Sequence, residues 1–371
     1  MLLQAQTLIH YLEELAPKRL AFDWDQVGLQ LGSSHGTVKK VLVALDFDER
    51  VLAEASSVGA DFILTHHPFI FRPLSAVRTD LPQGRLLAAA LAAGVRIYAS
   101  HTNLDVVSGG VNDALAARLG LHELEVLQVR GTQCFEKIAV FVPSGHEDKL
   151  RDALAAAGAG WIGSYSHCTF QSPGTGTFIP WEGTNPHIGE QGKLERVAEI
   201  RLETIYPAEL RKRVVSAMLK AHPYEEAAYD LYPLLNAGKA YGLGRTGKLE
   251  QACTLDEFCA VVKEKLELTT LRLAGEAKQI KKVAVCGGSG GELLQAAQFA
   301  GADVLVTGDL KYHQAKEAEA MGIAVIDAGH DATERVIIPV LCTYLRDKFA
   351  QDGYDVEVLA SAVSTAPWKT L

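Results

Sequence analysis

The chain has 371 residues, of which 48% are hydrophobic and 22% are charged, and its formal net charge is −9. This length predicts two or three domains with large cores, and the composition is that of an ordinary globular protein. The negative charge argues against broad nucleic-acid binding through phosphate neutralisation. No segment approaches the run of about 18 to 20 apolar residues that a membrane helix needs, so we expect no membrane association.

The first predicted element is an amphipathic helix over residues 1–15. Glu13 and Glu14 stand where a signal peptide would be apolar. The six cysteines contain no CxxC pair and no disulfide framework, which fits reduced thiols. We therefore expect a cytoplasmic protein without a structural zinc site.

The N-terminal half alternates strands with helices. We predict strands over 41–45, 62–64 and 95–99, with helices over 48–57 and 84–93 between them. Gly59 and Gly94 stand where the two helices should end. This rhythm indicates a mostly parallel, buried sheet in an α/β domain.

The middle of the chain, residues 131–240, does not repeat that rhythm. Its predicted order is βαββαβ, the ferredoxin-like pattern, with elements at 138–142, 147–156, 163–170, 197–202, 207–220 and 228–231. A Gly- and Pro-rich loop, residues 172–193, joins the two central strands, and a loop of that length is usually functional or mobile. We interpret this segment as an inserted α+β domain.

The C-terminal half returns to the first rhythm. Predicted strands and helices alternate at 283–286, 292–299, 304–306, 313–321 and 324–326, and a long helix follows at 333–349. The expected domains are therefore 1–130 and 241–371, as two related α/β halves of one core, and the insertion 131–240.

The two halves repeat each other in detail. Val41 and Thr65 are 24 positions apart, as are Val283 and Thr307. The strand before His101 and the strand before His330 are each followed, four residues after the histidine, by a carboxylate: Asp105 and Glu334. Because both halves deliver such side chains from the carboxyl ends of their strands, we predict a metal site between the halves.

His66 and His67 follow the strand at 62–64. Adjacent side chains on a strand point to opposite faces, so both can join one cluster only if the backbone turns, and Pro68 favours a turn. The alternative is a pair of loop histidines that only form hydrogen bonds. The internal repeat favours a metal-binding role.

His330 and Glu334 lie on one face at the start of the predicted helix; the alternative is a surface pair worth about 0.3 kcal/mol. Asp105 would be costly at an apolar strand end without a cation. Imidazole with carboxylate suits Zn, Fe, Mn, Co or Ni. Glu334 could bridge two such ions.

The roles of three features stay open at this point. His101 is a ligand, a proton shuttle or a group that orients a ligand. The loop Gly287–Gly291 is a phosphate-binding turn or a tight strand-to-helix turn. His313, four residues after Asp309, is a reserve candidate for the site.

Taken together, residues 24–30, 65–68, 101–105, 307–309 and 329–334 resemble the NIF3-like family of dinuclear-metal-centre proteins, often labelled GTP cyclohydrolase 1 type 2 homolog. The resemblance covers nearly the whole chain. It implies two divalent metal ions per chain, with His66, His67, Asp105, His330 and Glu334 as ligands, and a toroidal homohexamer. Segments 174–180, 183–189 and 222–226 resemble the family's long form, which carries a PII/CutA-like inserted domain.

The leading functional hypothesis is a metal-dependent hydrolase that acts on a nucleotide or a related small molecule, a GTP cyclohydrolase-like reaction by the family label. Two ions would lower the pKa of a shared water and polarise the substrate. The alternative is a non-enzymatic, metal-binding regulatory or chaperone-like ring protein with a ligand-sensing inserted domain.

Overall fold

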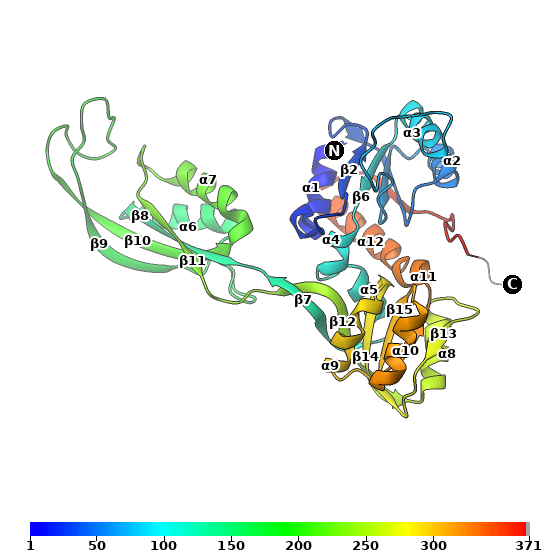
Figure 1. Ribbon diagram of the computed structural model, residues 1–371. Coiled ribbons are helices and arrows are strands. Elements are labelled where there is room, and N and C mark those ends of the chain that lie inside the picture. The colour runs from blue at the N-terminus through cyan, green and yellow to red at the C-terminus, as the bar shows by residue number, and fades with distance from the viewer. Residues whose placement is uncertain (369–371) are drawn as a thin grey trace. The chain divides into compact units, whose positions relative to one another are not determined.

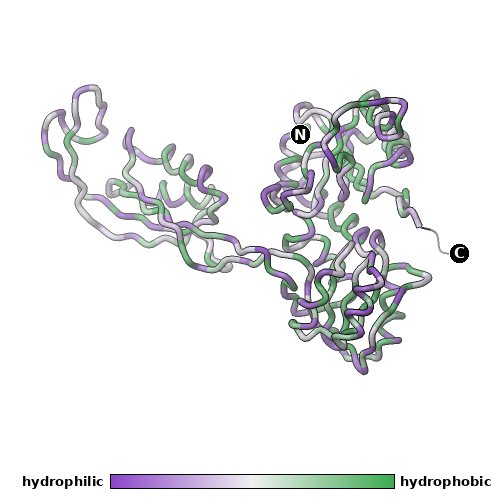
Figure 2. The backbone as a smooth tube through the Cα atoms, in the orientation of Figure 1, coloured by the Kyte–Doolittle hydropathy of each residue, from purple (hydrophilic) through white to green (hydrophobic). Residues whose placement is uncertain are grey.

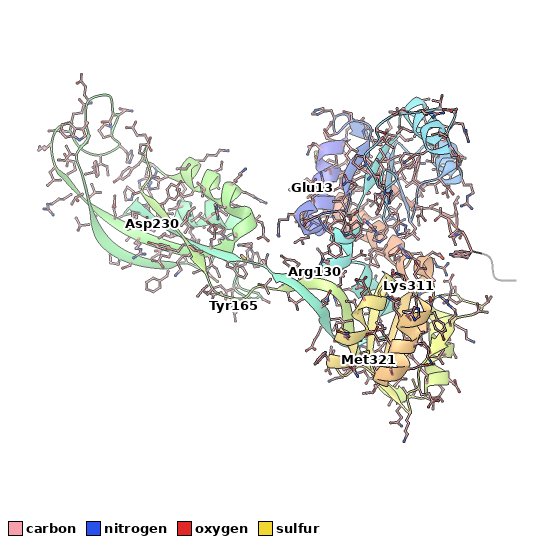
Figure 3. All side chains as sticks on the ribbon, in the orientation of Figure 1. Glu13, Arg130, Tyr165, Asp230, Lys311 and Met321 are labelled. Carbon is pink, nitrogen blue, oxygen red and sulfur yellow. The ribbon has the colours of Figure 1, made fainter. Side chains whose placement is uncertain are left out.

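The computed structural model describes residues 1–368 and divides into two compact units. The core unit consists of Met1–Arg130 and the chain from Tyr241 onward, and the inserted unit is Gly131–Ala240 (Figure 1). Arg130, where the first segment of the core unit ends, is labelled in Figure 3. No helix within the described residues is both long and apolar enough to cross a membrane.

The first half of the core unit is a five-stranded sheet in the order β17-β4-β5-β6-β2. Its strands are β2 (Gly28–Leu31), β4 (Lys40–Ala44), β5 (Phe62–Thr65), β6 (Arg96–Ala99) and β17 (Glu357–Ala360). All neighbours are parallel except β2, which runs antiparallel to β6. A separate two-stranded sheet pairs β1 (Leu3–Gln4) with β3 (Thr37–Val38).

Helices cover both faces of this sheet, because alternate apolar side chains of each strand point to opposite sides. On one face, Val41 and Leu64 pack against α1 (Ala5–Leu15) and α12 (Ile337–Gln351). On the other face, Leu42 and Ile63 pack against α2 (Glu49–Val58) and α3 (Pro82–Ala93). Figure 2 colours the backbone by hydropathy, and hydrophobic stretches recur throughout the core unit.

The second half is a six-stranded sheet in the order β13-β16-β15-β14-β12-β7. Its members are β7 (His122–Thr132), β12 (Ala240–Cys253), β13 (Arg272–Ala274), β14 (Ile280–Ser289), β15 (Val304–Gly308) and β16 (Ala324–Asp327). β14, β15 and β16 are parallel, as β4, β5 and β6 are in the first half. One face is covered by α5 (Val111–Arg118) and α8 (Leu255–Lys265), the other by α9 (Leu294–Phe299) and α10 (Tyr312–Met321).

The inserted unit has the element order βαββαβ. It comprises β8 (Phe135–Pro143), α6 (Glu147–Ala156), β9 (Phe170–Phe178), β10 (Glu195–Pro207), α7 (Arg211–Ala221) and β11 (Tyr229–Leu234). The sheet is antiparallel in the order β11-β8-β10-β9, and both helices pack on one of its faces (Figure 1).

Some predicted elements differ from the structure. The strand expected at 163–170 is wrong, because Gly163 and His167 have positive φ and the strand β9 begins only at Phe170. The loop expected at 172–193 is shorter than predicted, because its residues up to Phe178 belong to β9. Pairing with β10 outweighs the low strand propensity of Gly174 and Gly176, and Pro is tolerated because β9 is an edge strand. The single helix expected at 333–349 is instead α11 (His330–Glu334) followed by α12.

Candidate metal centre

The predicted site residues lie where strands of the core unit end. His66 and His67 directly follow β5, and their ring centroids are 5.0 Å apart, so the turn before Pro68 brings both rings to one cluster. Asp105 comes from the short helix α4 (Thr102–Val106), which follows β6. His330 and Glu334 are the first and last residues of α11, which follows β16.

These five side chains converge. Oε1 of Glu334 lies 3.7 Å from Nε2 of His66, and Oδ1 of Asp105 lies 3.6 Å from the same nitrogen. Oε2 of Glu334 lies 2.9 Å from Nε2 of His67 and 3.1 Å from Nε2 of His330. The carboxylate of Glu334 therefore stands between two groups of ligand-type atoms, one at each of its oxygens.

A second layer of acceptors fixes the tautomer of every histidine in the cluster. Nδ1 contacts an oxygen at 2.7 to 2.8 Å in each ring: His66 to the carbonyl of Ser100, His67 to Asp46, His101 to Asp25 and His330 to Asp309. A carbonyl or a carboxylate can only accept, so Nδ1 donates the hydrogen and the lone pair of a neutral ring resides on Nε2. Histidines that bind metals are held in this way.

Buried atoms in the cluster lack the partners that burial demands. Nε2 of His66 and Oδ1 of Asp105 are buried, and neither forms a hydrogen bond within the described residues. With Nδ1 protonated, these two atoms present lone pairs to each other at 3.6 Å. Such an arrangement is costly unless a positive charge lies between the groups. The residues present therefore fit a cation.

The pKa shifts of the histidines and of Glu334 also indicate that the cluster favours positive charge. Burial alone would lower the pKa of His67, but the carboxylates of Asp46 and Glu334 outweigh it and raise the pKa to about 10. The carboxylate of Glu334, whose Oε2 lies 3.1 Å from Nε2 of His330, is the main cause that raises the pKa of His330 to about 9. Burial opposes ionisation of Glu334, yet the surrounding histidines hold its pKa well below the usual range. The carboxylates thus draw positive charge into the cluster, as protons or as metal ions.

Burial raises the pKa of the Asp105 carboxyl, even though His66 beside it acts in the opposite direction. The pKa of the Cys286 thiol is also raised by burial, so this nearby side chain stays protonated. The centre therefore offers nitrogen and oxygen donors, and a thiolate is not among them.

His101 belongs to the same cluster. Its ring centroid is 5.2 Å from that of His66 and 5.5 Å from that of His67, and ligand atoms of the three rings all lie within 4.8 Å of one another. Burial would raise the pKa of Asp25, but hydrogen bonds from His101 and Thr102 lower it to about 2. This geometry suits both a ligand and a proton carrier.

The structure assigns neither the loop Gly287–Gly291 nor His313 to the cluster of ligand-type residues. The N–H of Gly288 donates to Thr333 and that of Gly290 donates to Thr307, so the glycine loop supports α11 rather than presenting these groups to a phosphate. A Cβ at Gly288 would lie 2.2 Å from Oε1 of Glu334, which explains the glycine. His313 is exposed on α10 and belongs to neither group of ligand-type residues found within residues 1–368.

Two cavities of the core unit reach the cluster. One, of about 580 Å³, includes His101, Asp105 and Glu334 and has an aromatic wall of Trp24 and Phe71, whose ring centroids are 5.8 Å apart. The other, of about 1000 Å³, is lined by apolar side chains and by polar and charged ones that include Asp46, Asp309, Arg272 and Arg335. His67 and His330 line both cavities, so the cluster is accessible to small molecules.

Fold and site together define a mixed α/β protein whose strand ends gather histidines and carboxylates able to hold a metal ion. The family model for Duf34/NIF3 (NGG1p interacting factor 3) matches residues 3–367, and the chain belongs to this family. A relative from Halalkalibacterium halodurans, named GTP cyclohydrolase 1 type 2 homolog, is 48% identical over 98% of each chain. A Bacillus subtilis relative of the same name is 45% identical over 99% of this chain and 98% of its own.

Solved structures agree. A Bacillus cereus protein related to NIF3 matches with a TM-score of 0.93 and 44% identity, and the match covers 100% of both chains. The Staphylococcus aureus protein SA1388 matches with a TM-score of 0.77 and 30% identity over 100% of this chain and 99% of its own. The family resemblance inferred from the motifs is confirmed.

Proposed function

We propose that the centre holds two divalent metal ions, drawn from Zn, Fe, Mn, Co and Ni. His66, Asp105 and Oε1 of Glu334 would hold one ion. His67, His330 and Oε2 of Glu334 would hold the other, so that Glu334 is shared. The observation that carries this assignment is the division of the nitrogen and oxygen donors between the two oxygens of Glu334.

We propose further that the protein is a metal-dependent hydrolase for a nucleotide or a related small molecule. When bound, a pair of such ions lowers the pKa of a coordinated water and polarises a substrate oxygen. The name of the relatives, GTP cyclohydrolase 1 type 2 homolog, points to a guanine nucleotide. The aromatic pair Trp24 and Phe71, 54% and 46% exposed in the wall of the smaller cavity, can stack on a planar base.

In this proposal His101 carries the proton. Its Nδ1–H is engaged by Asp25 at 2.8 Å, so Nε2 is the atom that accepts a proton during the reaction. Asp25 also accepts hydrogen bonds from the backbone N–H and the hydroxyl of Thr102, and this keeps it ionised. The ionised carboxylate stabilises the imidazolium that forms and fixes the orientation of the ring.

The proposal extends to the inserted unit and the assembly. The order βαββαβ with sheet order β11-β8-β10-β9 supports a ferredoxin-like, PII/CutA-like domain. The homohexamer implied by the family resemblance is part of the same proposal. Sedimentation of the full chain tests it directly, and a monomer or dimer at micromolar concentration would contradict it.

The decisive experiment combines metal content with turnover. The chain, freed of metal, is reconstituted separately with each of the five metals, counted by elemental analysis and incubated with GTP and the other nucleoside triphosphates. We expect about two ions per chain and hydrolysis of at least one nucleotide. Glu334→Gln should lose both ions and the activity. The control Glu319→Gln removes a carboxylate that pairs with Lys316 on α10, outside the cluster, and should behave like the wild type.

The outcomes separate the two parts of the proposal. About one ion per chain or fewer in the wild type would overturn the dinuclear centre. Two ions without turnover of any nucleotide would overturn the hydrolase and favour the regulatory or chaperone-like alternative. Turnover that survives Glu334→Gln would show that the activity does not depend on this centre.

A further inference from the structure

The inserted unit contains a cavity of its own, about 510 Å³ in volume. The three segments that resemble the long form of the family, 174–180, 183–189 and 222–226, all contribute to its lining. Its walls are largely apolar and aromatic, with Phe141, Phe178 and Tyr224 among them. The volume lies within the range of small-molecule sites.

A buried carboxylate faces this cavity. Glu199 on β10 is only 9% exposed and belongs to the lining. It alternates with Ile200 and Leu202, which pack toward the helices, so its side chain lies on the opposite face of the sheet. Gly176 on the neighbouring strand makes room for it, because a Cβ there would lie 2.2 Å from Oε2 of Glu199.

The protein itself gives this carboxylate little compensation. Within residues 1–368 its hydrogen-bond partner is the hydroxyl of Tyr224, which donates to Oε1 at 3.2 Å. His222 lies nearby but is held neutral: its Nε2 donates to the carbonyl of Phe141, and its Nδ1 accepts the backbone N–H of Tyr224. A buried carboxylate with one neutral hydrogen bond is a strong acceptor for a positive charge.

The lining disfavours anionic ligands. It contains Glu199, Glu225 and Glu226 but no Lys or Arg, and its one histidine is His187, so a phosphate or carboxylate ligand would meet three carboxylates and one imidazole. Arg201 lies over the ring of Phe141, at 5.9 Å, but is paired with Glu203 at 2.7 Å. The groups of metal-ligand type found among the described residues all lie in the core unit, so a bare metal ion has no cluster here.

The roof of the cavity is the loop between β9 and β10. Pro180, which is buried, and Pro186 and Ile188, which are half-buried, come from this loop and line the cavity. The backbone N–H of Asn185 donates to Oε1 of Glu225 at 3.0 Å and fastens the loop over the opening. The rings of Phe178 and Tyr224, with centroids 5.9 Å apart, form an aromatic wall on which a cation can rest.

We propose that this cavity binds an organic cation, a protonated amine or quaternary ammonium with an apolar body, whose charge pairs with Glu199. The apolar part fills the space between Phe178, Tyr224 and the roof. The site is independent of the metal centre and of the reaction proposed for it.

The test measures the affinity of the full chain for three probes by saturation-transfer NMR titration: phenethylammonium, the neutral 2-phenylethanol and the anionic 3-phenylpropanoate. We expect the ammonium to bind at least about tenfold more tightly than the alcohol, because charge-assisted hydrogen bonds contribute that much, and the carboxylate not to bind. Glu199→Gln should make the ammonium and the alcohol equal. The control Glu182→Gln removes one charge from the same loop outside the lining and should keep the preference.

A second variant keeps the test decisive if Glu199→Gln does not fold. Gly176→Val leaves the charge in place but fills the space beside it, and it should abolish binding of both phenethylammonium and the alcohol. Thermal unfolding of each variant serves as the folding control. Equal binding of all three probes by the wild type, no binding of the ammonium, or an unchanged preference in folded Glu199→Gln would each overturn the proposal.

Discussion

Glu334, from the second half of the core unit, contacts histidines of both halves through its two carboxylate oxygens. Oε1 faces His66, and Oε2 faces His67 and His330. Its side chain is only 5% exposed, so its charge must be compensated inside the protein. Without a metal that compensation comes from protonated histidines, and the carboxylates of Asp46 and Glu334 together raise the pKa of His67 to about 10.

The residues that accept a hydrogen bond from Nδ1 of the histidines should affect metal affinity nearly as much as the histidines themselves. Asp309 has φ of 53°, a left-handed conformation, and accepts from Nδ1 of His330 at 2.8 Å. Backbone strain of this kind is kept where function requires it. Asn tolerates the same conformation, so Asp309→Asn should preserve the fold. It should weaken metal affinity by about 10- to 100-fold, as loss of an outer carboxylate does.

Competition with a chelating dye measures this effect on the metal-loaded full chain. The matched control is Asp331→Asn in α11, which removes a carboxylate paired with Arg335 at 3.4 Å instead of one behind a histidine. Equal metal affinities for Asp309→Asn and Asp331→Asn would mean that the outer carboxylate plays no part.

His222 predicts how the inserted unit responds to pH. Burial lowers its pKa, although Glu199 acts in the opposite direction and His146 adds to the lowering. The folded state therefore binds this proton less readily than the unfolded state, whose histidine titrates near pH 6.5. The contribution to stability is complete above about pH 6.5 and is lost as the pH falls from there toward the lowered pKa of the folded state.

NMR titration of the full chain should place the pKa of His222 below that of a free histidine. Thermal unfolding between pH 8 and pH 5.5 should depend less on pH in His222→Gln than in the wild type. His122, which is exposed on β7, provides the control variant His122→Gln. A His222 that titrates at or above pH 6.5 would contradict this reasoning.

At the scale of elements, the sequence predicted the strands and helix ends that depend on local sequence patterns. The strand expected at 62–64 is β5, and the one at 324–326 is β16. Gly59, Gly94 and Gly322 end their helices in the left-handed conformation that favours glycine. The spacing of the repeat then predicted His66 directly after β5, and Asp105 and Glu334 shortly after β6 and β16, where they lie in α4 and α11.

Elements that depend on distant partners were not predicted. β9 contains Pro173, Gly174 and Gly176 and is a strand only because β10 pairs with it. β7 was also not predicted: it is mostly exposed, and its alternation of apolar and polar residues is interrupted at Val126 and Leu127. Asp25 and Asp46 were missed as supports of His101 and His67, because both lie in irregular segments and reach the site only through the tertiary fold.

At the scale of the whole molecule, each unit carries its own hydrophobic core. The buried clusters of the core unit contain only residues before 131 or after 240. The buried cluster of the inserted unit lies entirely between Ile138 and Ala221. Every residue that we assign to the metal centre belongs to the core unit. Folding and metal binding of the core unit therefore require no side chain from the insertion.

Deletion of residues 131–240 should leave a folded, metal-binding core unit. β7 and β12 are neighbours in the sheet, and a Cβ on Gly242 would lie 2.9 Å from the backbone nitrogen of Arg130, so the two ends are already adjacent. An Asn-Gly turn can join Arg130 to Tyr241 as a two-residue hairpin.

We expect the deletion protein to unfold cooperatively on heating and to bind the same number of metal ions per chain as the full-length protein. A second version with a longer Gly-Ser linker separates strain in the turn from loss of the insertion. If both versions are insoluble or free of metal while the full chain is soluble and loaded, the insertion contributes to the core unit in a way that its own buried cluster does not show.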